Sequence, residues 1–552
     1  MKSLLIGAAV AAALSGAAAA DTDGSFDHDG NVRHGHFFIP GNLVVSRSVY
    51  DNKASNVVVG TVLPPNCAAT TGGCGAPSGA PNDGTYPTVW NNDIYDASFG
   101  ITSRIFLDEM TPFGWVIDTL PVPSNPTQRG RSADHLVTSF SSKSELALNL
   151  SNDGRFITFM GYVAPINTVD VSNSNTPGAV DPTNPVGTEF ARAVAQVDAD
   201  GVFQFTETNA YSGNNGRAAI QSDSRGVDLI YTVGNAGNGA NPQPNGIILG
   251  AGAQILSPAG APQAAQVPGV PTPVASFSVT ELGAKADKIG KDDNYRGLTI
   301  FNNVLYFTKG SGSNGVNTVY FVDTTGSACP KGVGLPAPGA KLPVAALAFT
   351  AANLQTTGLP DNVCILAGFP QTPNKSATVT AFPFGIWFAD ARTLYVADEG
   401  DGDTSGADLY THAAAQTTAG LQKWVFNGAT GAWALAYTLT NGLNLGQAYD
   451  VRGYPSGSNP ATGLPWAPAT DGLRNITGQV GRDGVATIWA ITSTISGNGD
   501  VGADPNRLVA IRDAVANTDG GAASKERFST LHTAEFAEVL RGVAFTPGTD
   551  LH

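Results

Sequence analysis

Four arginines recur at the same position of a short apolar pattern that repeats along the chain. The opening residues of six such runs are Glu145, Arg217, Arg296, Phe384, Arg474 and Arg541. A guanidinium binds carboxylates and phosphates through two parallel hydrogen bonds, so four arginines brought together predict a site for an anionic group. The alternative is structural, because each arginine can instead pair with backbone carbonyls or with acids nearby in sequence, such as Asp292, Asp471 and Glu538.

A second candidate site is the acidic loop that contains Asp398, Asp401 and Asp403, with Asp408 beyond it. Closely spaced oxygen ligands on a glycine-rich backbone are what calcium requires, so calcium is the cofactor expected here. The alternative is a solvated acidic loop that binds nothing. A weaker group of the same kind is formed by Asp500 and Asp504.

Other catalytic patterns are not found in the sequence. There is no Gly-x-Ser-x-Gly nucleophile motif and no phosphate-binding Gly-Lys loop, and the seven histidines are scattered. His135 and His532 fall in segments expected to be loops between repeats, where either could act as an acid or base. No partner residue is evident for them, so the catalytic residues are left unassigned.

The four cysteines are expected to form disulfides. Cys67 pairs with Cys74 across a short loop in this interpretation, and Cys329 pairs with Cys364. Disulfides are typical of exported proteins. A zinc site is disfavoured because the Cys67 to Cys74 spacing is wider than that of usual zinc-ligand pairs.

The elements that must position these residues are short strands in repeated groups of four. The stretch from Phe384 to Asp398 reads as two strands around a polar turn, and further apolar-alternating runs follow it as third and fourth strands. In the group that begins at Arg296, the third strand is expected at Thr318–Asp323 and the fourth at Val344–Phe349. Four-stranded units of this kind are the blades of a β-propeller.

The ends of the chain decide the blade count. Arg541 opens a first strand near the C-terminus, whereas Asn42 opens a second strand near the N-terminus, with third and fourth strands at Arg104–Asp108 and Trp115–Leu120. The C-terminal strand is therefore expected to complete the N-terminal blade and close the ring without a free edge. We predict an all-β, six-bladed β-propeller, with a seven-bladed ring as the alternative.

Composition and charge limit the domain organisation and the location. Residues 1–20 resemble a secretory signal peptide, residues 21–36 form an acidic segment expected to be flexible, and residues 37–552 form a single propeller domain. We expect an exported protein, periplasmic or extracellular, without a transmembrane segment. A net charge of −15 disfavours nucleic acid as a partner.

The expected connections differ between the two faces of the ring. Turns between first and second strands are short, as at residues 151–154 and 301–303, whereas connections between second and third strands are long, as at residues 164–187 and 399–411. Long loops between blades emerge on the same face as these long connections. We therefore expect the binding site on the long-loop face.

The stretch from Phe384 to Asp398 resembles a signature of known propellers. An inner strand, a polar turn and the sequence Leu-Tyr-Val-Ala-Asp recur in the six-bladed gluconolactonase and regucalcin-like proteins and in NHL-repeat proteins. The lactonase resemblance implies a divalent metal held in the channel by acidic and asparagine side chains near the starts of inner strands. Glu145 corresponds to one such ligand. Arginine at four of the six openings departs from that pattern.

Two functions are consistent with these observations. The first is an exported binding or scaffold protein whose long-loop face and arginine-lined channel mouth hold an anionic small molecule, a glycan or a protein partner. The second is a calcium-dependent hydrolase of lactones or phosphoesters, in which the metal polarises the substrate and activates water.

Overall fold

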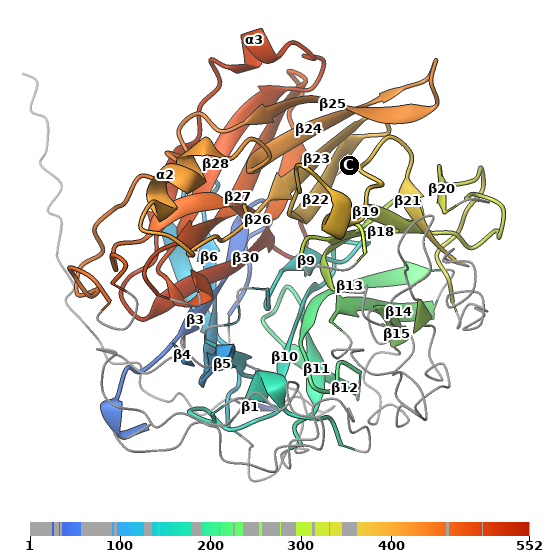
Figure 1. Ribbon diagram of the computed structural model, residues 1–552. Helices are drawn as coiled ribbons and strands as arrows, with labels where there is room; N and C mark the ends of the chain where they lie inside the picture. Colours follow the sequence, from blue (N-terminus) through green and yellow to red (C-terminus); the bar gives the residue numbers. More distant parts are fainter. Residues whose placement is uncertain are drawn as a thin grey trace, which may run out of the picture.

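Six antiparallel β-sheets follow one another around a common axis in the computed structural model, which confirms the predicted six-bladed propeller (Figure 1). The structure describes residues 36–56, 100–125, 135–169, 171–177, 189–235, 253–256, 294–344 and 362–550, except 141, 143, 209, 225–226, 312–314, 330–331, 460–462 and 499–500. It also describes strand residues 25–26, 32–33, 91–92, 96–99 and 276–277. The expected signal peptide, Cys67 and Cys74 lie outside these ranges.

Blades 1 to 3 begin at the innermost strand and run outward. Blade 1 contains β9 (Asn149–Leu150), β10 (Ile157–Tyr162), β11 (Arg192–Val197) and β12 (Phe203–Thr208). Blade 2 contains β13 (Gly216–Ser224), β14 (Val227–Gly234), β15 (Ala253–Leu256) and β16 (Ser276–Phe277). Blade 3 contains β17 (Tyr295–Phe301), β18 (Val304–Lys309), β19 (Thr318–Val322), β21 (Val363–Leu366) and a fifth strand, β20 (Val333–Gly334).

Blades 4 to 6 complete the ring. Blade 4 contains β22 (Pro383–Asp390), β23 (Thr393–Asp398), β24 (Gly420–Asn427) and β25 (Ala432–Leu439). Blade 5 contains β26 (Ala469–Val480), β27 (Val485–Ile495), β28 (Arg507–Ala514) and β29 (Ser529–Thr533). Blade 6 contains β30 (Glu538–Phe545), β3 (Leu43–Val49), β6 (Thr102–Met110) and β7 (Val116–Pro121), and β8 (Thr138–Ser139) pairs with β6.

The remaining elements are short. Two hairpins lie outside the blades, formed by β1 (Ser25–Phe26) with β2 (Val32–Arg33) and by β4 (Asn91–Asn92) with β5 (Asp96–Gly100). Helix α2 (Leu409–Ala415) lies in the long connection of blade 4, and α3 (Gly520–Ala523) precedes β29. No helix among the described residues is long and apolar enough to cross a membrane.

The C-terminal strand closes the ring as the sequence predicts. Strand β30 pairs along its length with β3, from Leu43 opposite Phe545 to Val49 opposite Glu538. Arg47 on β3 reinforces this closure, because its guanidinium bonds Asp108 on β6 at 2.6 Å and Glu538 on β30 at 2.5 Å. Blade 6 therefore joins the two ends of the described chain without leaving an unpaired inner strand.

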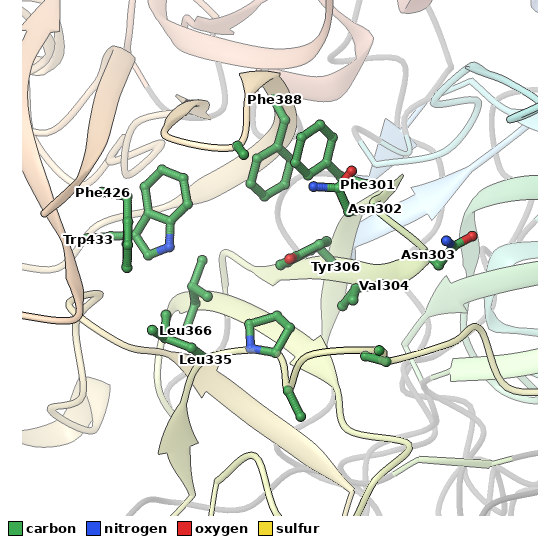
Figure 2. A pocket seen from close by; sticks show the side chains of 15 residues that line it. Phe301, Asn302, Asn303, Val304, Tyr306, Leu335, Leu366, Phe388, Phe426 and Trp433 are labelled. Atoms are coloured by element: carbon green, nitrogen blue, oxygen red, sulfur yellow. The ribbon is translucent and has the colours of Figure 1, made fainter. Parts of the chain in front are cut away.

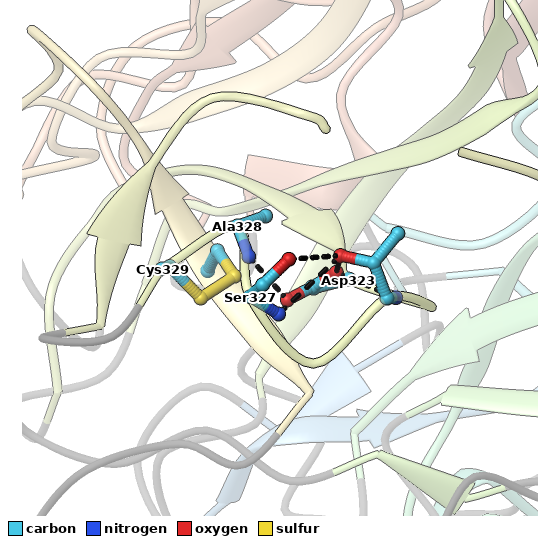
Figure 3. Close-up of a disulfide and its surroundings, with 6 residues drawn as sticks. Asp323, Ser327, Ala328 and Cys329 are labelled. Carbon is cyan, nitrogen blue, oxygen red and sulfur yellow. Dashed lines mark hydrogen bonds between the residues drawn. A yellow bond between two sulfur atoms is a disulfide. The ribbon is translucent and has the colours of Figure 1, made fainter. Parts of the chain in front are cut away.

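The fourth strand of blade 3 is not the predicted one. Strand β21, which contains Cys364, pairs with β19, whereas most of the predicted run Val344–Phe349 lies outside the described residues. The predicted Cys329–Cys364 disulfide is confirmed and ties β21 to the segment that follows β19. Figure 3 shows Asp323 beside this bond, where its carboxylate accepts from the backbone N–H of Ala328 at 2.8 Å.

Neighbouring inner strands approach each other closely at glycines. Gly297, Gly385 and Gly542 each follow one of the repeated opening residues, and a Cβ on any of them would meet the backbone of the next blade. Hydroxyl groups on second strands hold the same contact, because Ser46 donates to the carbonyl of Leu146 at 2.8 Å and Thr308 donates to that of Phe384 at 2.6 Å. The blades are thus joined at the axis by backbone contacts.

We predict that Gly297→Ala destabilises the protein by on the order of 1–3 kcal/mol, because the added methyl group would overlap the Phe384 carbonyl oxygen. Chemical denaturation monitored by circular dichroism measures the loss. Gly428→Ala is the matched control, since a Cβ there meets nothing within 4 Å. Equal stability of the two variants would contradict the close approach.

Candidate functional site

The six opening residues lie in the inner strands or, for Glu145, just before one, and the structure buries all of them. Arg217 is 5% exposed, the other three arginines are 3% exposed, and Glu145 and Phe384 are 1% exposed. The arginines therefore do not form an open, solvent-filled mouth within the described residues. They form a buried cluster at the long-loop end of the channel.

Glu399 is the acid that joins two of these arginines, and it is not among the site residues predicted from the sequence. Its Oε2 lies 3.3 Å from Arg474 Nε, and its Oε1 lies 3.9 Å from an Arg296 terminal nitrogen. Glu399 directly follows β23, the second strand of blade 4. It therefore links the end of that strand to the inner strands of blades 3 and 5, which carry Arg296 and Arg474. Glu399 stands next to Asp398 in the acidic loop, so its position in the sequence was a reason to consider it as a site residue. Its arginine partners are far away along the chain, so the pairing could not be predicted from sequence spacing.

Arg296 and Arg541 also connect blades through neutral groups. Arg296 donates to the hydroxyls of Ser144 and Ser311, and its guanidinium lies 5.9 Å from the centre of the Phe384 ring. The Arg296 bond to Ser144 reaches the segment before the inner strand of blade 1. Arg541 donates to Ser48 at 3.2 Å and to two backbone carbonyls in the segment before blade 1. These contacts fit the structural alternative for both arginines.

Glu145 is held by hydrogen bonds from β8, from β10 of blade 1 and from the residue that precedes β13 of blade 2. Its carboxylate accepts from the Thr138 hydroxyl at 2.6 Å, from Asn215 at 2.9 Å and from the Tyr162 hydroxyl. These donors satisfy the buried charge without a cation. The residue that the lactonase resemblance implies as a metal ligand is thus fully engaged by protein donors.

No carboxylate pairs with Arg217 in the described part of the chain. Its guanidinium donates to the Asn294 side chain and to the Tyr295 carbonyl at 3.2 Å, and its buried Nε–H has no acceptor among the residues that the structure describes. Burial is the main cause that holds the pKa of Arg217 well below its usual value, and the charge of Arg296 lowers it further. Glu399 and Glu145 act in the opposite direction with smaller effects.

The three predicted calcium ligands do not converge on one point. Asp398 is fully buried and accepts from the backbone N–H groups of Phe382 at 2.8 Å and Gly400 at 3.0 Å. Asp401 lies 2.7 Å from His412 Nε2, and Asp403 lies 3.8 Å from the same atom. Hydrogen bonding to Asp401 raises the pKa of His412. A calcium ion shared by all three aspartates would require the Asp398 carboxylate to leave its backbone donors.

Only one group of three metal-ligand side chains comes together among the described residues, and it is formed by Asp323, Cys329 and Cys364. Both sulfurs in it are joined as a disulfide, so they are not available as thiolate ligands.

Three of the described histidines lie in or directly beside the blades. His532 lies in β29 and not in a loop as predicted, because that edge strand continues to Thr533. His135 is buried just before β8. His36 is also buried and lies 2.8 Å from Asp118, so the last residue of the expected flexible segment already belongs to the folded domain.

A cavity of about 710 Å³ lies at the opposite, short-turn end of the inner strands. It is lined by the ends of β9, β17 and β22 and by the turns at residues 151–154 and 302–303. Its charged lining residues are Asp153 and Asp550, and no basic side chain faces it among the described residues. This cavity is therefore unsuited to an anion, and it lies on the face where the sequence analysis did not place the binding site.

Asp504, one of the weaker calcium candidates, is instead a buried structural carboxyl, and Asp500 lies outside the described residues. The Oδ1 atom of Asp504 accepts from the Tyr454 hydroxyl and from Ser496 at 3.1 Å. Burial raises the pKa of Asp504 to about 7, because the charged form is poorly solvated, and it raises that of Asp398 to about 7 for the same reason.

We predict that the free energy of unfolding falls as the pH rises from about 4 to about 7. The carboxyl groups of Asp398 and Asp504 keep their protons up to a higher pH in the folded state than in the unfolded chain. The stabilisation that these two protonated groups provide is therefore complete only below the pKa that an aspartate has in the unfolded chain. Asp504→Asn should remove part of this fall, on the order of a few kcal/mol, in denaturation curves recorded across that range. The exposed Asp483→Asn serves as the control, and identical slopes for both variants would contradict the assignment.

No protein-family model and no curated protein matches the chain. Among solved structures, it is similar to an ulvan lyase of polysaccharide lyase family PL25, with 11% identity, TM-score 0.28, and coverage of 81% of this chain and 90% of the lyase. Drosophila Semaphorin 1a is matched with 11% identity, TM-score 0.26, and coverage of 78% and 84%.

An acylaminoacyl peptidase from Pyrococcus horikoshii is matched at 8% identity and TM-score 0.24, with 77% of this chain aligned to 43% of that chain. At such TM-scores these likenesses carry no argument. None of the comparisons confirms the gluconolactonase, regucalcin-like or NHL-repeat resemblance. The chain is a six-bladed β-propeller, and its topology rests on the pairing of its own strands.

Proposed function

We propose that this protein is an exported binding protein that holds a small anionic group beside Arg217, at the long-loop end of the central channel. The observation that carries the proposal is the burial of the Arg217 guanidinium without a carboxylate partner among the described residues. A carboxylate, sulfate or phosphate is the chemical group that matches this guanidinium.

A buried guanidinium charge destabilises the folded protein unless its surroundings compensate for the lost hydration. Removing an ion from water costs several kcal/mol unless a counter-charge and hydrogen bonds offset that cost. Arg217 has a neutral amide oxygen and one carbonyl as acceptors, and its Nε–H is left without one. A bound anion would supply both the missing charge and the missing acceptor.

The neighbouring charges support an anion rather than a cation. Arg296 exerts the largest charge effect on Arg217, larger than that of Glu399 or of Glu145 taken singly. Glu399 is also shared between two arginines, Arg296 and Arg474. The Glu399 carboxylate thus lies beside two guanidiniums, and neither of them is that of Arg217.

The proposal is narrower than the four-arginine ring expected from the sequence. Arg296, Arg474 and Arg541 connect blades through the contacts described above, so their main role is structural, and Arg217 is the residue assigned to the ligand. The anionic group could belong to a free small molecule, to a glycan or to an acidic segment of a protein, since all three present the same oxygen acceptors.

The geometry offers less support for the calcium-dependent hydrolase. That function needs a cation with an open coordination position for substrate and water. Asp398 is bound to backbone amides, and Asp401 and Asp403 are directed to His412. We therefore favour binding over hydrolysis.

The test uses sulfate, phosphate and acetate as probes in thermal denaturation, with chloride added to hold the ionic strength constant. We expect at least one of the probes to raise the melting temperature saturably, because a ligand of the folded state stabilises it by mass action. Arg217→Met should abolish this shift while remaining folded, since the variant removes an unpaired buried charge.

Arg512→Met is the matched control, because Arg512 is exposed and pairs with Asp483 at 2.9 Å on the surface. It should keep the anion-dependent shift. If no anion stabilises the unmodified protein and Arg217→Met lowers its stability, Arg217 has a structural role and the proposal is wrong.

A further inference from the structure

A second cavity, of about 460 Å³, lies between blades 3 and 4 on the short-turn side, away from Arg217 (Figure 2). Its walls come from the β17–β18 hairpin, from Phe388 on β22, from the β24–β25 hairpin, and from residues 335–340. Its volume lies within the usual range for pockets that bind small molecules.

The aromatic wall of this pocket is packed in fixed positions. The Phe301 and Phe388 rings stack with centres 4.4 Å apart and planes 6° from parallel, and Tyr306 lies 4.7 Å from Phe388. Trp433 meets Phe388 edge-on at 5.9 Å, and its backbone N–H bonds the Ala367 carbonyl at 2.8 Å. Such a wall is formed before any ligand arrives, so little ordering is needed on binding.

Two polar groups on these rings have no hydrogen-bond partner among the described residues. They are the Tyr306 hydroxyl and the Trp433 indole N–H, although Tyr306 is only 6% exposed and Trp433 only 7% exposed. Figure 2 shows both directed into the space between the aromatic rings and Leu335. Burial raises the pKa of Tyr306, which keeps its hydroxyl protonated and able to donate.

Several comparable groups elsewhere in the described part of the protein are paired. The Trp424 indole donates to Gln422 at 3.0 Å and the Trp489 indole to the Pro112 carbonyl at 2.9 Å. The Tyr320 hydroxyl donates to the Val316 carbonyl at 2.6 Å. Buried Tyr and Trp usually find such partners, so two donors that face one pocket without a protein partner are available to an acceptor from outside the chain.

The lining also determines the charge of the ligand. Among the described residues, no acidic, basic or histidine side chain lines the pocket, whose floor is formed by Leu335, Pro336 and Ala337. A charged ligand would lose its hydration here without gaining a counter-charge. Asn302 and Asn303 at the exposed turn add polar groups only at the rim.

We propose that this pocket binds a neutral, flat, largely apolar molecule that carries a carbonyl or ether oxygen. The oxygen accepts from Tyr306 and Trp433, while the apolar rings of the ligand pack between Phe388 and Leu335. The site is independent of the anion site, because its ligand class is different and its walls contain no arginine.

Coumarin is the probe for this proposal, since it is flat and neutral and carries a carbonyl group. Naphthalene is its counterpart without an acceptor. Ligand-observed NMR titrations should show saturable binding of coumarin, weakened roughly five- to tenfold by Tyr306→Phe or Trp433→Phe. Naphthalene should bind more weakly than coumarin and should be insensitive to Tyr306→Phe.

A blocking variant locates the binding. Ala391→Trp places a large side chain at the exposed rim of the pocket and should abolish coumarin binding. Ala429→Trp, on the exposed β24–β25 turn outside the lining, should leave it unchanged. Absence of coumarin binding, or binding that none of the Tyr306, Trp433 and Ala391 variants alters, would overturn the proposal.

Discussion

The structure depends on the close approach of inner strands around the propeller axis. Twisted sheets can meet there only where side chains leave room, and glycines such as Gly297, Gly385 and Gly542 supply it. Second-strand hydroxyls then bond the carbonyls of the next inner strand, as Thr158 does with Ala219 at 2.7 Å. The ring is therefore held at its centre by backbone contacts, whereas the apolar cores lie further out between the blades.

This constraint also positions the charged cluster. Arg296 and Arg541 directly precede the close-contact glycines, so their side chains are delivered to the long-loop end of the channel. Once there, they bond to residues of other blades and reinforce the ring, as Arg474 does through Glu399. Arg217 shares the position but has only an amide oxygen and a backbone carbonyl as partners among the described residues, and it is the arginine to which we assign the ligand role.

The sequence predicted the fold more completely than the sites. Alternating runs and polar turns are local signals, so the strand order and the closure by β30 followed from them. Contacts between segments that are distant in the sequence could not be predicted in this way. The ion pair between Glu399 and Arg296 and the inward orientation of Asp398 are two examples. The pocket around Phe388 was also missed, because its lining comes from several separate segments between Phe301 and Trp433. The fourth strand of blade 3 was misplaced because two apolar runs competed for one position.

The most direct test of the account is a crystal structure of the protein soaked in selenate, with anomalous diffraction measured at the selenium edge. The account predicts an anomalous peak within hydrogen-bonding distance of the Arg217 guanidinium, with its Nε–H among the donors. A map without a peak at Arg217, or one in which a carboxylate of the chain itself occupies that position, would contradict the assignment of an anion site.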